Sequence, residues 1–220
     1  MTPMRKRAAI LISGRGSNMA ALIAAAKNPA YPAEIALVLA SRPDAKGLAL
    51  ARAQNIATAI VDHTSFGQNR AAFERDIDAV LARHRIDLVC LAGFMRVLTP
   101  WLVERWDGRM LNIHPSLLPA FKGLDTHARA LAAGVKIHGA SVHFVAPETD
   151  SGAIIAQAAA PVRDDDTEAT LAARVLAAEH RLYPLALKLV AEGRVHVADG
   201  RCVIDGAPST DAILLSPAGD

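Results

Sequence analysis

Short apolar runs alternate with stretches of helical periodicity through the first half of the chain. Such runs are typical of buried strands, whereas apolar residues that recur every three or four positions are typical of helices. The predicted strands span residues 8–13, 34–40, 58–61, 88–92 and 110–113, and the predicted helices span 19–27, 45–54, 69–84 and 99–106. This order of elements predicts a parallel sheet covered by helices on both faces.

The pattern changes after residue 114. The elements predicted there are a helix at 125–133, strands at 139–144 and 153–160, a long helix at 165–192 and a hairpin at 195–198 and 201–204. Asp165 and Glu168 resemble a capping box at the start of the long helix, and Pro184 is expected to kink it. We therefore predict an α/β fold: a single Rossmann-like three-layer domain over residues 1–205, whose mostly parallel sheet gains antiparallel strands toward the C-terminus. Residues 206–220 are expected to form a flexible tail.

Composition narrows the class of protein. The 220 residues are 52% hydrophobic, and 24 basic against 22 acidic residues give a net charge of +2 without a basic stripe, which argues against a nucleic-acid partner. No apolar stretch approaches the roughly 20 residues of a membrane span, and the run after the basic residues 5–7 breaks too soon for a signal peptide. Cys90 and Cys202 have no paired spacing, which fits a reducing compartment. We expect a cytoplasmic protein without a membrane partner, in which residues 1–7 are bystanders.

The strand at 110–113 runs into a loop that carries two candidate catalytic residues. Side chains alternate along a strand, so Asn112 and His114 should point the same way while their neighbours point into the core. Pro115 and Pro119 should hold the following loop in shape. An amide donor beside an imidazole suits a reaction in which negative charge develops on a carbonyl oxygen. The alternative is that both side chains only satisfy loop backbone.

A glycine-containing turn joins the first predicted strand to the first helix. Free N–H groups and the positive end of the helix dipole meet there, so Gly16, Ser17 and Asn18 are predicted to bind an anion, most plausibly a phosphate. A dinucleotide site would need a glycine in place of Met19 and an acidic residue in place of Ser41, which disfavours NAD. The alternative is an ordinary tight turn.

Two charged residues interrupt apolar helical faces. Glu179 lies on the buried stripe of the long helix, where an unpaired carboxylate is costly, so it should meet a cation or an amine. Arg70 lies on the first turn of its helix, where a cation opposes the dipole, and it could face a carboxylate ligand. The alternatives are a structural ion pair for Glu179 and an ordinary surface arginine for Arg70.

Asp150 lies in a loop between two predicted strands. If that loop folds back to His114, the carboxylate would fix the imidazole tautomer and favour its protonated form. His127, His138 and His143 have no metal-ligand spacing and are expected to be ordinary hydrogen-bonded histidines, so no metal is predicted.

Six stretches together resemble the phosphoribosylglycinamide formyltransferase family, which is folate-dependent and acts in purine synthesis. They span residues 12–18, 91–98, 111–119, 138–145, 150–152 and 179–184, so the likeness covers nearly the whole chain. The resemblance implies the formyltransferase fold and transfer of a formyl group from 10-formyltetrahydrofolate, a co-substrate, to the amine of glycinamide ribonucleotide. The protein would act on these small molecules without metal or nucleic acid, as a monomer or homodimer. Ala153 departs from the proline of many relatives.

The resemblance also assigns roles to individual residues. The catalytic residues would be Asn112, His114 and Asp150. The nucleotide would meet Gly16, Ser17, Asn18 and Glu179. The folate would meet Arg70, Met95, Arg96, Val97, Leu98, Asn112, Ala146, Pro147, Glu148, Thr149 and Asp150.

Three rival functions share this fold, and we expect the sequence to disfavour each of them. Methionyl-tRNA formyltransferase would carry a further C-terminal domain and a basic face. Formyltetrahydrofolate deformylase would usually carry a regulatory domain before a first strand that here begins at Ala8. A folate or nucleotide sensor without activity would be favoured by loss of the catalytic side chains, all of which are present.

Overall fold

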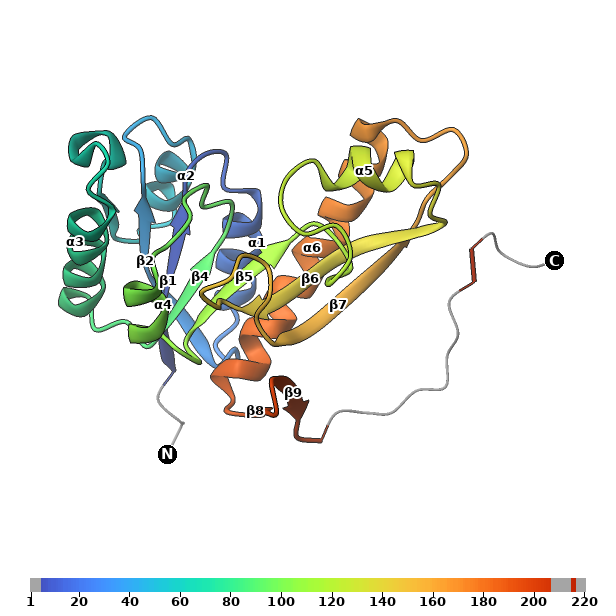
Figure 1. Ribbon diagram of the computed structural model, residues 1–220. Helices are drawn as coiled ribbons and strands as arrows, with labels where there is room; N and C mark the ends of the chain where they lie inside the picture. Colours follow the sequence, from blue (N-terminus) through green and yellow to red (C-terminus); the bar gives the residue numbers. More distant parts are fainter. Residues whose placement is uncertain (1–4, 207–214, 217–220) are drawn as a thin grey trace.

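A seven-stranded sheet is the centre of the computed structural model, which describes residues 5–206 and 215–216 (Figure 1). The strands are β1 (Lys6–Ile12), β2 (Ala33–Ala40), β3 (Thr58–Ile60), β4 (Leu88–Leu91), β5 (Met110–His114), β6 (Ile137–Phe144) and β7 (Ile154–Pro161), in the order β3-β2-β1-β4-β5-β6-β7. Neighbours from β3 to β5 are parallel, whereas β6 and β7 join antiparallel. The predicted mostly parallel sheet with antiparallel additions is confirmed.

Helices cover both faces of the sheet, which gives three layers (Figure 1). They are α1 (Ser17–Ala26), α2 (Gly47–Ala53), α3 (Arg70–Arg83), α4 (Pro100–Arg105), α5 (Thr126–Ala132) and α6 (Glu168–Ala191), with a 3-10 turn η1 (His63–Phe66). Because side chains alternate along β1, Ile10 lies in the core under α1, α2 and α6, while Leu11 lies in the core under α3 and α4. The protein therefore has two apolar cores that share one sheet.

The strand order brings the candidate site residues to one edge of the sheet. The chain runs outward from β1 through β2 to β3, and then crosses to β4 on the other side of β1. Ligands of such sheets bind in the crevice outside the carboxyl ends of the strands at this switch point. The turn after β1, the segment after β4 and the loop after β5 all start at this edge.

One predicted detail of α6 differs from the structure. The capping box is formed by Thr167 and Thr170 and not by Asp165 and Glu168. Asp166 instead pairs with Arg174 at 2.6 Å, so this one acidic side chain before the helix braces its second turn. The helix continues through Pro184, and the kink expected there stays a prediction.

The predictions for the two ends of the chain are only partly confirmed. The hairpin forms as predicted, as β8 (Val195–Ala198) and β9 (Arg201–Ile204). Of the predicted tail at 206–220, residues 207–214 and 217–220 lie outside the described residues, so its flexibility stays a prediction. Residues 1–4 of the basic arm lie outside the described residues, but the bystander role is wrong for Arg5, which donates to the carbonyl oxygens of Ala26 and Tyr31 at 2.5 and 3.0 Å. Among described residues, no helix is both long and apolar enough to cross a membrane.

Candidate active site

The end of β5 presents Asn112 and His114 on one face of the sheet, as the alternation predicted. Leu111 and Ile113 point the other way, into the core under α1 and α6. His114 is buried and Asn112 is partly exposed. The imidazole is therefore held inside the protein, whereas the amide remains open to a ligand.

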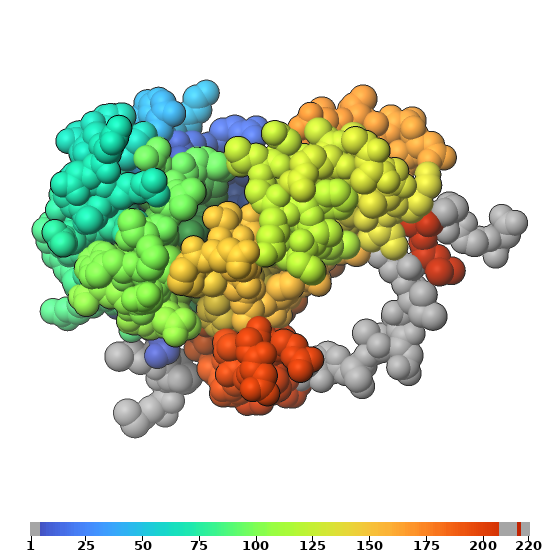
Figure 2. Space-filling view, viewed as in Figure 1, coloured from blue at the N-terminus to red at the C-terminus, as the bar shows by residue number. Residues whose placement is uncertain are grey.

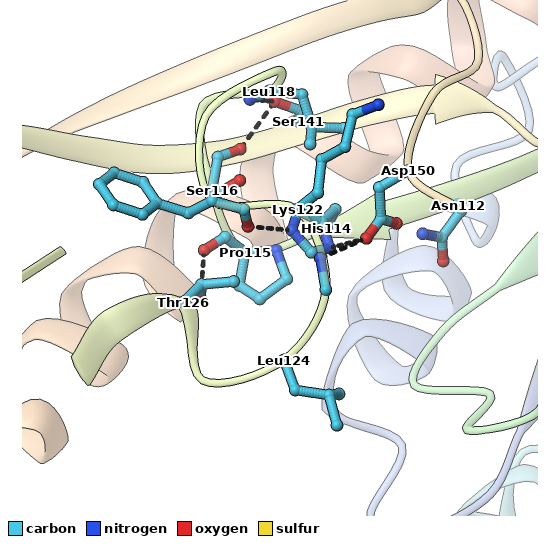
Figure 3. A network of polar contacts seen from close by, with 12 residues as sticks. Asn112, His114, Pro115, Ser116, Leu118, Lys122, Leu124, Thr126, Ser141 and Asp150 are labelled. Carbon is cyan, nitrogen blue, oxygen red and sulfur yellow. Dashed lines mark hydrogen bonds and ion pairs between the residues drawn. The ribbon is translucent and has the colours of Figure 1, made fainter. Parts of the chain in front are cut away.

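His114 has an acceptor at each ring nitrogen. Its Nδ1 lies 3.3 Å from Oδ2 of Asp150, and its Nε2 lies 3.0 Å from the carbonyl oxygen of Phe121. A carbonyl and a carboxylate can only accept, so a doubly protonated ring satisfies both contacts. The predicted contact between His114 and Asp150 is confirmed, and Asp150 lies between His114 and Asn112 in the close view (Figure 3).

The carboxylate of Asp150 is fixed by its own loop and by a second one. Asp150 adopts a left-handed backbone conformation with φ +51°, and its Oδ2 accepts a hydrogen bond of 2.9 Å from the N–H of Gly123. Gly152 makes the return of the loop possible, since a Cβ there would lie 1.8 Å from the carbonyl oxygen of Phe144. The loop after β6 and the loop after β5 are thus joined at the carboxylate of Asp150.

Two residues that the sequence reasoning missed hold the loop after His114. The hydroxyl of Ser141 accepts from the N–H of Leu118 at 3.0 Å and donates to the carbonyl of Ser116 at 2.7 Å. Gln157 donates to the same hydroxyl at 2.8 Å and to the carbonyl of Leu118 at 2.9 Å. Ser141 lies opposite His114 in the β5–β6 ladder, and the alternation of β6 was the signal that could have found it.

His143, which the sequence analysis treated as an ordinary histidine, lies opposite Asn112 in the same ladder. Its Nε2 is 3.2 Å from Nδ2 of Asn112, and its Nδ1 is 2.7 Å from the carbonyl oxygen of Phe144. The ring is buried, and desolvation is the main cause that lowers the pKa of His143 below its usual value. Burial therefore favours a neutral imidazole against the amide of Asn112.

The turn after β1 forms the floor of a cavity of about 430 Å³. Gly16 precedes α1 with φ +78°, a left-handed conformation that glycine adopts freely, and the first turn of α1 contains no acidic residue. Gly16, Ser17 and Asn18 all line the cavity, together with Met95 and Arg96 from the segment after β4. In the space-filling view, blue atoms of the N-terminal segment lie deep in the hollow between the green and yellow-green surfaces (Figure 2).

The charges around this cavity suit an anion. Arg15, Arg96 and His63 line it, and in the described part of the chain neither arginine has an ion-pair partner. Ser17 and Asn18, which line the cavity, belong to the first turn of α1, whose N–H groups have no acceptor within the helix. The predicted anion site thus has the shape and the charge that a phosphate requires, while phosphate binding itself stays a prediction.

Glu179 meets an amide and not a cation. Its Oε2 accepts a hydrogen bond of 2.6 Å from Nδ2 of Asn18, and burial raises the pKa of Glu179 above its usual value. Among the described residues it has no ion pair, so the structural ion pair is wrong. Oδ1 of Asn18 is buried without a hydrogen-bond partner. The pair therefore offers acceptor oxygens to a ligand with N–H or O–H donors.

The residues predicted to bind folate do not line a single cavity. Met95 and Arg96 line the first cavity, whereas Ala146 and Pro147 line a second cavity of about 300 Å³ beside α4. Val97 is 63% exposed and Leu98 is buried. Glu148 and Thr149 belong to the exposed loop that ends at Asp150.

Arg70 lies apart from both cavities. It is exposed at the first position of α3, as predicted, but it lines neither cavity. The structure therefore leaves its contact with a ligand as a prediction.

The prediction that the other histidines are hydrogen-bonded is confirmed only in part. His143 is hydrogen-bonded as expected, but both ring nitrogens of His138 and Nδ1 of His127 are buried without partners. Burial lowers the pKa of His138 to about 4. Within residues 5–206 and 215–216, no group of three or more His, Cys, Asp or Glu side chains is arranged to hold a metal ion.

A sheet edge that joins an imidazole–carboxylate pair, an amide donor and an anion cavity defines an enzyme site for transfer of an acyl-type group. In keeping with this, residues 6–187 match the formyl transferase family, and the chain belongs to it. A phosphoribosylglycinamide formyltransferase of Escherichia coli (strain K12) is 43% identical over 197 residues, which are 90% of this chain and 92% of the relative.

A longer relative and a solved structure extend the likeness. The trifunctional purine biosynthetic protein adenosine-3 of Gallus gallus is 49% identical over 88% of this chain, which spans only 19% of that protein. The crystal structure of glycinamide ribonucleotide transformylase 1 from Symbiobacterium toebii superposes with a TM-score of 0.88 and 42% identity, covering 91% of this chain and 94% of that one. The predicted formyltransferase fold is confirmed.

Proposed function

We propose that this protein transfers the formyl group of 10-formyltetrahydrofolate to the amine of glycinamide ribonucleotide, a step of purine synthesis. The observation that carries the proposal is the contact of 3.3 Å between His114 and Asp150 beside the open amide of Asn112. Formyl transfer needs a site that stabilises a tetrahedral oxyanion and moves one proton, and these three side chains supply both functions. The likeness to the E. coli formyltransferase along nearly its whole length supports the choice of substrates.

The acceptor end of the site suits the nucleotide. The cavity at Gly16, Ser17 and Asn18 receives the ribose phosphate, with Arg15 and Arg96 adding positive charge. The acceptor oxygens of Asn18 and Glu179 receive donors of the same molecule, its amine or its hydroxyl groups. Strands β4 and β5 are adjacent, with Leu91 opposite Asn112. The cavity wall after β4 therefore lies beside the end of β5, which carries Asn112 and His114.

The reaction then follows from the polar groups. The neutral amine attacks the formyl carbon, and the carbonyl oxygen becomes an oxyanion that faces the free N–H of Asn112 and the positive ring of His114. The contact between Nδ1 of His114 and Asp150 is long, at 3.3 Å, so the N–H at Nδ1 can also donate to the oxyanion. One such donor is typically worth ~2.7–4 kcal/mol in the transition state. Asp150 keeps the ring charged and, through water, helps move the proton from the attacking nitrogen to the leaving folate nitrogen.

The folate is proposed to lie across the exposed apolar side chains after β4 and the loop after β6. Met95 and Val97 are 70% and 63% exposed, so two neighbouring apolar side chains face solvent in the free protein. They offer a suitable surface for the pterin ring. Residues 146–149 would close over it, and Arg70 would contact the glutamate tail. The protein is further proposed to act in the cytoplasm as a monomer or homodimer, without nucleic-acid or membrane partners.

Product analysis tests this function. The protein is incubated with 10-formyltetrahydrofolate and glycinamide ribonucleotide, and the nucleotide is followed by mass spectrometry for the gain of one formyl group. A formylated nucleotide formed together with tetrahydrofolate is the expected result. Formate and tetrahydrofolate with unmodified nucleotide would replace the proposal with a deformylase. Tight binding of both substrates without any product would replace it with a sensor.

A further inference from the structure

The amide of Asn112 must present an N–H and not its oxygen to the developing oxyanion. Rotation of a carboxamide by half a turn exchanges its donor and acceptor ends with almost no change of shape. A wrongly turned Asn112 would repel the oxyanion that it is supposed to stabilise. The site therefore needs a group that fixes which end of the amide faces the substrate.

His143 is placed to be that group. Antiparallel pairing sets Asn112 of β5 directly opposite His143 of β6, so their side chains lie on the same face of the sheet. Nε2 of the ring is 3.2 Å from Nδ2 of the amide. The ring is buried at 2% exposure and cannot turn away to solvent.

The protonation of the ring follows from its other contacts. Nδ1 lies 2.7 Å from the carbonyl oxygen of Phe144, which can only accept, so Nδ1 carries a proton. A second proton on Nε2 would place a positive charge in a buried position, which is costly. Asp150 is the one described anion near the ring, with Oδ1 at 3.8 Å from Nε2, but its other oxygen is engaged by His114 at 3.3 Å and by the N–H of Gly123.

We propose that His143 is a positioning residue that holds Asn112 with its N–H groups directed for catalysis. The bare Nε2 accepts one N–H of the amide, which forces the NH₂ end toward His143 and leaves its second N–H for the substrate oxygen. A turned amide would set its oxygen against the lone pair of Nε2. His143 thus acts through Asn112 and has no contact with the reacting atoms.

Nitrogen NMR tests the tautomer without reference to activity. In protein with ¹⁵N-labelled histidine, His143 should show a protonated Nδ1 and a bare Nε2 throughout the neutral pH range. A proton on Nε2 would overturn the proposal, because the ring would then demand the oxygen of Asn112. This outcome would leave the proposed function intact, whereas absence of formyl transfer by the wild type would refute that function and leave the tautomer result standing.

A mutant cycle tests the catalytic consequence, which rests on the proposed function. His143→Phe removes the acceptor and keeps a ring, and it should lower kcat by about tenfold to a hundredfold with both KM values nearly unchanged. His143→Gln, whose side-chain oxygen can accept from the amide, should recover part of that loss. In an Asn112→Ala background the His143→Phe change should cost less than about twofold. Equal losses in both backgrounds, or an undiminished kcat for His143→Phe, would contradict the proposal.

Discussion

Asn18 and Glu179 are joined by a hydrogen bond of 2.6 Å although 161 positions separate them in the sequence. The bond connects the first turn of α1 to the middle of α6 at the edge of the anion cavity. Burial raises the pKa of Glu179, so its ionised form costs folding free energy that the amide of Asn18 only partly offsets. The residue is better explained by the ligand than by the stability of the free protein.

Glu179→Gln should therefore stabilise the protein while weakening nucleotide binding. The pKa of Glu179 is higher in the folded state than its usual value of 4.5, so the protonated carboxyl adds to the free energy of unfolding below pH 4.5. This contribution is lost as the pH rises through the folded-state pKa. The melting temperatures of wild type and variant should coincide near pH 4 and diverge above it, with the variant higher. The KM for the nucleotide should rise by about tenfold, the cost of a hydrogen bond to a charged group. A variant that melts lower than wild type at pH 8 would contradict this account.

Asp150→Asn should lower kcat by about a hundredfold or more and leave the fold unchanged. Asparagine tolerates the left-handed backbone at this position and can still accept from Gly123, so the substitution removes little except the negative charge beside His114. The matched control is Asp164→Asn, the same chemical change at an exposed carboxylate that pairs with Lys136. Steady-state kinetics and circular dichroism measure both variants. Near-normal turnover of Asp150→Asn would remove Asp150 from the mechanism.

Gly16→Ala should raise the KM for the nucleotide and lower kcat little. The new Cβ would lie 3.1 Å from Cε of Met19 and 3.2 Å from Cα of Gly47, so the phosphate turn must shift. Gly108→Ala is the control, because Gly108 has a similar left-handed φ of +65° but open space around it. Both variants should lose about 1 kcal/mol of stability from backbone strain. An unchanged nucleotide KM for Gly16→Ala would mean that the turn only links β1 to α1.

Arg70→Ala tests the proposed contact with the glutamate tail of the folate. An exposed ion pair is worth at most about 1 kcal/mol, so the KM for the folate should rise roughly twofold to fivefold without a change in kcat. Stability should not fall, since a cation at the start of α3 opposes the helix dipole. Arg75→Ala, on the exposed surface of the same helix, should change neither constant. Equal KM values for wild type and Arg70→Ala would identify Arg70 as an ordinary surface residue.

The sequence predicted those parts of the site that depend on local periodicity. Asn112 and His114 are two residues apart on a strand, so a common face follows from strand geometry alone. The turn at Gly16 and the burial of Glu179 follow equally from local pattern. The order of strands and helices predicted the layered fold for the same reason.

The parts of the fold and site that the sequence did not predict depend on strand register and on competition between similar local signals. The partnership of His143 with Asn112 requires the alignment of β5 with β6, and a shift of one residue would have placed His143 on the other face. Thr167 and Thr170 form the cap of α6 in place of Asp165 and Glu168, and the neighbouring Asp166 pairs with Arg174, contacts that local spacing does not reveal. His138 was expected to be hydrogen-bonded, and only the packed structure shows that both of its ring nitrogens are buried without a hydrogen-bond partner.

Donor turnover with and without the acceptor tests the central claim most directly. Absorbance at the folate reports consumption of the 10-formyl donor by wild type and by His114→Ala, each with and without glycinamide ribonucleotide. The account predicts turnover that requires the nucleotide and that His114→Ala nearly abolishes. Consumption of the donor at the same rate without nucleotide, or a His114→Ala variant as active as the wild type, would contradict it.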